Sequence, residues 1–194
     1  MFRLIGIVAA VMILFVACQA TTEPEWSAAP TREMIPNRAI SGEVNGELFE
    51  ANAVFFQPSF GRWELVIAEG ALERPTSITT EGRFVVITLP EAPQSGSVFT
   101  QAMQYGRGYF QVPKPDDPEN MTSWNARNAF IVEITAWEEE AYDPDGMLFQ
   151  AVGKAAGKVY VSYSGEGLEG FSNSFIAGSF DNGIIRYMGR PEKK

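Results

Sequence analysis

The chain has no histidine and only one cysteine, Cys18, among its 194 residues. Histidine is the only side chain whose ordinary pKa lies close to neutral pH. Its absence excludes nucleophile systems that need a histidine base, and it excludes zinc, copper and iron sites with histidine ligands. We therefore predict that the protein is not an enzyme and that it holds neither a metal nor a cofactor.

A hydrophobic run long enough to cross a membrane is also missing. The most apolar run covers residues 4–17 and follows the positive charge of Arg3, whereas a spanning helix needs about 20 apolar residues. A short apolar run behind a basic start is typical of an export signal, so we predict a signal peptide over residues 1–17. An ordinary signal with a coincidental cysteine, or an uncleaved N-terminal anchor, would give a similar pattern.

Positive charge is scarce, because 15 lysines and arginines face 24 aspartates and glutamates, for a net charge of −9. A protein of this charge is repelled by the phosphates of nucleic acids and by anionic lipid headgroups. We therefore predict no nucleic-acid partner. A single cysteine also means that no disulfide forms within the chain.

The run LFVAC at residues 14–18 resembles the bacterial lipobox, in which a small residue precedes the cysteine that is acylated. Phe15 stands where the lipobox usually has leucine. The resemblance implies that Cys18 becomes the N-terminus, carries acyl chains such as palmitate and anchors the protein in a membrane of the cell envelope. Gln19 follows, and by resemblance to the sorting rule of enteric bacteria it implies the outer membrane, facing the periplasm or the cell surface.

Residues 18–37 are polar, small and interrupted by proline, without an apolar period. This composition predicts a flexible tether that holds the domain away from the membrane. Trp26 is an exception, and it either packs on the domain or lies at the lipid interface. The remaining residues, 38–194, are predicted to form one domain.

The domain shows β patterning throughout. Asn45-Gly46 between two extended runs predicts a tight hairpin, because both residues tolerate positive φ. Phe130, Val132 and Ile134 alternate with a mixed set that includes Glu133 and Trp137. With 18 glycines and 12 prolines separating short strands, the sequence predicts an all-β fold, either an antiparallel β-sandwich or a partly closed barrel.

Three further segments are predicted from turn residues. The proline- and acid-rich residues 113–126 predict a surface loop, and the acidic residues 138–146 predict a second one. Asp181-Asn182-Gly183 predicts the turn of a closing hairpin over residues 175–188.

Two short motifs resemble those of a loose group of uncharacterised bacterial lipoproteins. One is Ser-Gly-x-Val-Asn-Gly-x-x-Phe, from Ser41 to Phe49, and the other is Gly-Ser-Phe, from Gly178 to Phe180. The resemblance covers only the two ends of the domain. It implies a β-sandwich-like domain of unknown role and transfers no catalytic residue.

An aromatic cluster is the main candidate binding site. Tyr105, Arg107 and Tyr109 are separated by glycines that permit a tight loop with both rings displayed, so they are candidates for binding a ligand or an acidic partner. The alternative is that these aromatic residues belong to the core.

Carboxylates give weaker candidates. Glu133 and Glu64, each near a tryptophan, would be the pair of a glycan-active enzyme, but strand alternation predicts that Glu133 faces solvent. The acids at residues 143–145 and 116–119 lie in patterns that lack the further ligands of a calcium loop. We expect both to be acidic turns.

The sequence therefore predicts a membrane-anchored envelope protein whose β domain is a non-enzymatic binding module for a protein, a glycan or a small ligand. One alternative is a structural or accessory subunit of an envelope complex. The other is a carboxylate-dependent enzyme acting on an envelope glycan.

Overall fold

The computed structural model describes residues 23–70, 83–101, 107–114, 117–124, 128–139, 149–166 and 171–188. These residues form an all-β fold, as predicted, with a single 3₁₀ turn, η1 (Arg32–Met34). Within the described ranges, no helix is long and apolar enough to span a membrane.

Eleven strands make up one sheet, and their bounds are as follows: β1 Ser41–Val44, β2 Glu47–Glu50, β3 Ala53–Ser59, β4 Arg62–Ala68, β5 Phe84–Leu89, β6 Val98–Thr100, β7 Arg107–Lys114, β8 Asp117–Trp124, β9 Asn128–Glu139, β10 Phe149–Tyr163 and β11 Ser174–Met188. Along the sheet they follow the order β6-β9-β10-β11-β3-β4-β5-β7-β8, and the β1–β2 hairpin also pairs with β11.

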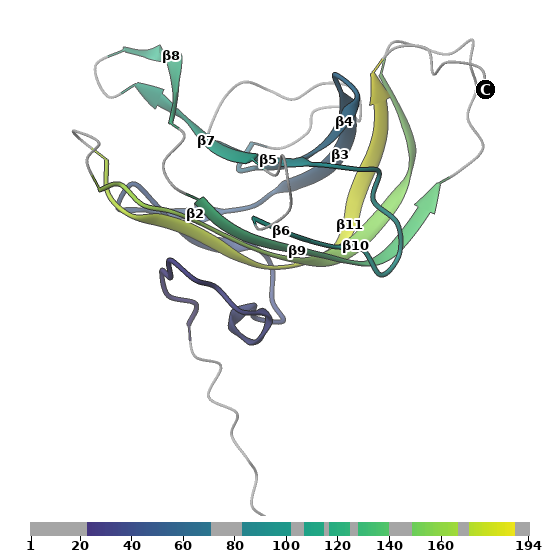
Figure 1. The fold of residues 1–194 in the computed structure, drawn as a ribbon. Helices are drawn as coiled ribbons and strands as arrows, with labels where there is room; N and C mark the ends of the chain where they lie inside the picture. The colour runs from purple at the N-terminus through teal and green to yellow at the C-terminus, as the bar shows by residue number, and fades with distance from the viewer. Residues whose placement is uncertain are drawn as a thin grey trace, which may run out of the picture.

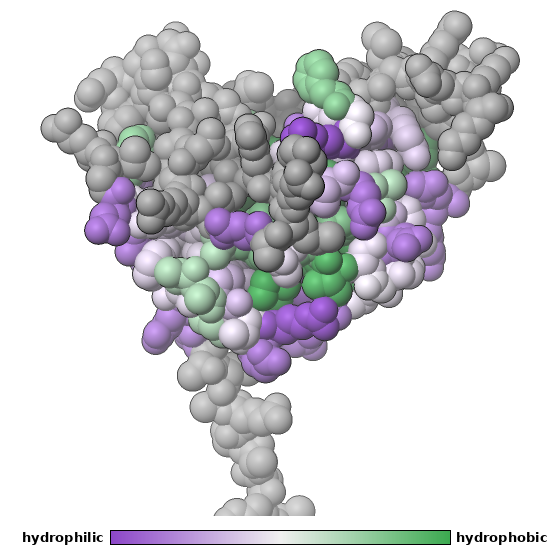
Figure 2. Space-filling model, viewed as in Figure 1, coloured by the Kyte–Doolittle hydropathy of each residue, from purple (hydrophilic) through white to green (hydrophobic). Residues whose placement is uncertain are grey.

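The sheet curls into a half-barrel (Figure 1). Of the two predicted architectures, this is the partly closed barrel. The strand pairs are antiparallel except for β11 with β3, which run parallel through Ile184↔Phe55 and Ile185↔Phe56. The apolar core fills the concave side of the curl, and its fully buried members include Phe49, Phe56 and Val132. In the view of Figure 2, hydrophilic side chains and side chains of intermediate hydropathy surround a small hydrophobic group near the middle of the described surface.

The predicted hairpin at Asn45-Gly46 is confirmed. The two residues have φ of 54° and 80° and connect β1 to β2. Positive φ at both central positions defines a turn whose twist matches the twist of paired strands.

The predicted closing hairpin is wrong, because β11 continues through Asp181-Asn182-Gly183 as one strand. Along the neighbouring strand β10, Ala155 pairs with Gly183 and Gly157 pairs with Phe180. Asp181 and Asn182 therefore lie opposite the single residue Ala156, which makes a β-bulge. The residues of a turn are used here to bend a strand.

A second bulge corrects the predicted face of Trp137. Ala136 pairs with Ala156 while Ile134 pairs with Gly157, so Thr135 is the extra residue on β9. An extra residue reverses the alternation of side chains beyond it. Trp137 consequently packs on the concave core, whereas Glu133 lies on the convex face.

The predicted loop over residues 113–126 is also wrong for most of its length. Residues 117–124 form β8, which pairs with β7 through contacts such as Val112↔Thr122. Pro118 is tolerated there because the register of β7 and β8 shifts between Pro113↔Met121 and Lys114↔Asp117, which leaves residues 118–120 of this edge strand out of the paired ladder. The second predicted loop lies largely outside the described residues.

The part of the predicted tether that the structure describes, residues 23–37, is not a free chain, because it packs on the convex side of β9, β10 and β11 (Figure 1). Ile35 is buried against Ile131 and Tyr160. The Trp26 indole donates to the carbonyl of Tyr163 at 2.8 Å, and the Tyr160 hydroxyl donates to the carbonyl of Glu25 at 2.5 Å. Trp26 therefore packs on the domain, which decides between its two predicted places.

Candidate functional site

The predicted aromatic site is not built as a displayed loop. Arg107 and Tyr109 belong to β7, where their backbones pair with Thr88 and Val86 of β5. Tyr105 lies outside the described residues, and so does the lipidation site Cys18. Pairing in a sheet extends the backbone, so the tight loop expected for these residues is wrong from Arg107 onward.

The predicted acidic loops are not seen as sites either. Residues 116 and 143–145 lie outside the described part, and Asp117 and Glu119 lie in β8. Among the residues that the structure describes, no three aspartates, glutamates or cysteines stand close enough to hold a metal ion.

The two predicted carboxylates are far apart. Glu64 is on β4 and Glu133 is on β9, four strand spacings away in the sheet order. At about 4.8 Å per spacing, this separates them by roughly 19 Å along the sheet. Paired carboxylates of glycosidases stand about 5–10 Å apart, so this pair does not have that geometry.

Glu64 has a structural partner on the convex face. It accepts a hydrogen bond from the Gln57 amide at 3.0 Å, and the Gln57 carbonyl accepts two from Arg186, at 3.1 and 2.7 Å. The Arg186 guanidinium lies 3.9 Å from the centre of the Phe55 ring. Burial lowers the pKa of Arg186 to about 10. Because this value is still well above neutral pH, the guanidinium stays charged there.

A groove forms where β11 changes partners along one of its edges. Its first half pairs with β1 through residues 175–177, and its second half pairs with β3 through Ile184 and Ile185. In between, the described residues place only the bridge from Ser179 to Ala39 on that edge. The bulge at Asp181-Asn182 lies in this gap. The polar side chains of these two residues therefore lie beside the part of β11 that has no strand paired along this edge in the described residues.

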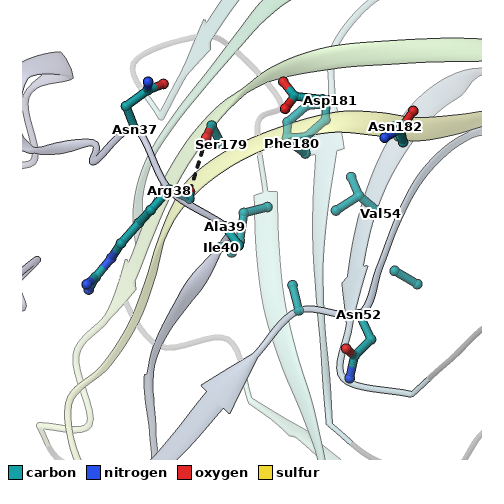
Figure 3. A pocket seen from close by; sticks show the side chains of 13 residues that line it. Asn37, Arg38, Ala39, Ile40, Asn52, Val54, Ser179, Phe180, Asp181 and Asn182 are labelled. Atoms are coloured by element: carbon teal, nitrogen blue, oxygen red, sulfur yellow. Dashed lines mark hydrogen bonds between the residues drawn. The ribbon is translucent and has the colours of Figure 1, made fainter.

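The groove has a volume of about 520 Å³ and opens to solvent (Figure 3). Hydrogen-bonding side chains come from separate segments, namely Asn37, Asn52, Asp181 and Asn182. Ala39, Ala51 and Val54 supply apolar surface that is at least partly exposed, while Ile40 and Phe180 lie behind it as buried core residues. Arg38 and Ser179 also belong to the lining. Such a lining suits a polar ligand with apolar faces.

The second of the two motifs that resemble those of other lipoproteins, Gly178 to Phe180, lies beside this groove, where it meets the chain that leads into the first motif. A Cβ atom on Gly178 would lie 2.5 Å from Cα of Ile40, so only glycine lets the incoming chain cross β11 there. Ser179 donates to the carbonyl of Arg38 from its backbone N–H at 2.7 Å and from its hydroxyl at 3.1 Å (Figure 3). The glycine and serine of the second motif thus hold the incoming chain in place beside the groove.

A second groove, of about 650 Å³, lies on the other side of Arg38, which lines both. It runs between residues 23–26 and the β1–β2 hairpin, and it contains Glu23, Glu25, Glu43 and Glu50. Arg38 lies 4.0 Å from Glu23. The local charge is therefore negative, unlike the first groove, whose charged residues are one aspartate, Asp181, and one arginine, Arg38.

Sequence reasoning missed the groove because no local pattern marks it. Asp181-Asn182 was the only signal, and it predicts a turn as readily as a bulge. Comparisons of the chain with protein-family models, with curated proteins and with solved structures found no match.

Proposed function

We propose that this chain is a lipid-anchored protein of the bacterial envelope, attached through Cys18 at the outer membrane, and that its half-barrel is a non-enzymatic module that binds an envelope glycan. The observation that carries the binding role is the groove at the split edge of β11. Its amide and carboxylate groups offer donors and acceptors, and its two charged residues, Arg38 and Asp181, are opposite in sign. Ala39, Ala51 and Val54 offer a small apolar surface for one face of a sugar ring.

The packing of residues 23–37 limits how far the domain can lie from a membrane in which Cys18 is anchored. Only five residue steps separate Cys18 from Glu23, and an extended chain of that length reaches at most about 18 Å. A lipid on Cys18 would therefore hold the domain close to the membrane surface, without a long flexible linker. A glycan layer adjacent to that membrane would lie within reach of the groove.

The test uses the Cys18→Ala chain with chitotetraose as a soluble N-acetylated oligosaccharide and with purified peptidoglycan sacculi. We expect saturable binding of one of these probes. Asp181→Ala and Asn182→Ala should weaken it at least tenfold at an unchanged melting temperature, because both residues are exposed. Gln94→Ala, which changes an exposed amide outside the groove, should bind as the wild type does. Absent binding, or equal binding by all variants, would remove the groove from the proposal.

A further inference from the structure

Two tight turns of the same kind occur in the described part of the chain, and they use very different residues. Asn45-Gly46 has φ of 54° and 80°, and Phe60-Gly61, between β3 and β4, has φ of 48° and 77°. Asparagine and glycine tolerate this left-handed region, whereas a bulky residue there is an outlier because its Cβ crowds the backbone. Phe60 therefore occupies a position that its side chain disfavours.

Phe60 also contributes nothing to the core. Its relative exposure is 105%, against 68% for Leu48, the other exposed large hydrophobic residue in the described ranges. A single exposed apolar side chain is ordinary on a protein surface. One that is exposed and also held in a left-handed backbone disfavours the fold in two independent ways, which points to a role outside the fold.

The position of the turn indicates what the ring meets. In Figure 1 the β3–β4 turn lies at the top of the half-barrel, while the chain enters from below, beside η1. If the protein is anchored at Cys18, as proposed above, the β3–β4 turn lies on the opposite side of the half-barrel from the segment that leads to the anchor. The net charge of −9 disfavours contact with a second, anionic bilayer.

We propose that Phe60 is the anchor residue of a protein-interaction surface, and that its ring enters an apolar pocket of a partner protein in the envelope. A single ring flanked by Ser59, Gly61 and Arg62 matches a pocket rather than a flat apolar interface. Aromatic residues in such fully enclosed positions dominate the affinity of many interfaces. This partner is distinct from the glycan of the groove, and only the orientation of the surface rests on the proposed anchoring.

The first experiment places the photocrosslinker p-benzoylphenylalanine at position 60, or at position 48 as a control, in the full-length protein in cells. We expect a discrete adduct with one protein from position 60 only, with the crosslink mapping to apolar residues of a pocket in that protein. Adducts with phospholipid, the same adducts from both positions, or no adduct from position 60 would each overturn the inference.

A second experiment separates binding from folding. Phe60→Asn should raise the melting temperature by about 1–4 °C, since asparagine suits the turn, and should reduce co-purification of the crosslinked partner at least tenfold. Leu48→Asn should leave co-purification unchanged, and undiminished co-purification of Phe60→Asn would contradict the proposal. Asp181→Ala should keep the position-60 adduct. An adduct from position 60 in a protein that binds no oligosaccharide would contradict only the proposed glycan groove. Oligosaccharide binding without an adduct from position 60 would contradict only this inference.

Discussion

The end of the domain where the chain enters and the opposite end, at the β3–β4 turn, differ in how firmly their residues are held. At the entrance, the incoming segment is bonded to β10 and β11, and Asn45 accepts a hydrogen bond from the backbone of Ser172 at 2.9 Å. At the opposite end, Phe60 is fully exposed in a strained turn. The residues at the entrance stabilise the fold, whereas Phe60 in the β3–β4 turn disfavours it. This contrast separates residues with a structural role from Phe60, which is a candidate for binding a partner.

Removal of residues 19–37 is expected to have the largest effect on the entrance end. It uncovers Ile131 and Tyr160 and removes the buried Ile35. The expected loss is roughly 3–5 kcal/mol, or about 10 °C in melting temperature. Thermal unfolding of this deletion against the mature chain measures it. An unchanged melting temperature would mean that the segment is the free tether that its composition suggests.

Arg83→Ala is expected to come next. Arg83 pairs with Glu69, donates to the carbonyls of Val44 and Leu48, and lies over the Phe49 ring. It thereby ties the β1–β2 hairpin to the ends of β4 and β5. Its loss leaves Glu69 and two carbonyls without this partner, at a cost of about 2–3 kcal/mol.

Urea unfolding measures the Arg83 effect, and Arg32→Ala is the matched control. Arg32 is exposed in η1 and carries the same charge. Its removal should change the free energy of unfolding by less than about 0.5 kcal/mol. Equal effects of the two substitutions would show that charge, and not the contacts of Arg83, matters.

The docked N-terminal segment should respond to alkaline pH through Tyr160. Burial raises the pKa of its hydroxyl to about 12, above its ordinary value of 10. The folded state thus favours the protonated form, so its contribution is complete below about pH 10 and is lost as the pH rises towards 12. Melting temperatures of the wild type and Tyr160→Phe should converge over this range, and a constant difference would contradict the assignment.

The smallest effects come from exchanging the two turns. Phe60→Asn should stabilise the protein by about 0.5–1 kcal/mol, and Asn45→Phe should destabilise it by about 1–2 kcal/mol, because it also removes the bond to Ser172. Chemical unfolding gives both values. If both substitutions destabilise the protein, Phe60 supports the fold and the contrast between the two ends fails.

The sequence was informative where local chemistry decides the structure. Asn45-Gly46 forms its hairpin because the preference for positive φ lies in the two residues themselves. The alternation around Phe130 and Val132 likewise identified a strand whose apolar face lies in the main core, but it did not reveal that Ile131, on the other face, is buried under the incoming segment.

Prediction failed where distant pairing decides. Asp181-Asn182-Gly183 has the chemistry of a turn, yet the long partner β10 holds it in a bulge. The groove exists only because β11 changes partners there, and no residue pattern encodes that change. The composition of residues 23–37 suggests a tether, because the few residues that bury themselves, such as Ile35, show no period.

Native-state hydrogen exchange of the mature chain tests most directly whether the domain begins at residue 23. The account predicts that the amide of Ile35, which donates to the carbonyl of Arg32 at 3.1 Å, and the amide of Ser179, which donates to Arg38, exchange slowly together. The amides of Phe60 and Gly61 should exchange quickly. Exchange of residues 25–37 at the rate of an unfolded chain, with Ser179 unprotected, would contradict the account.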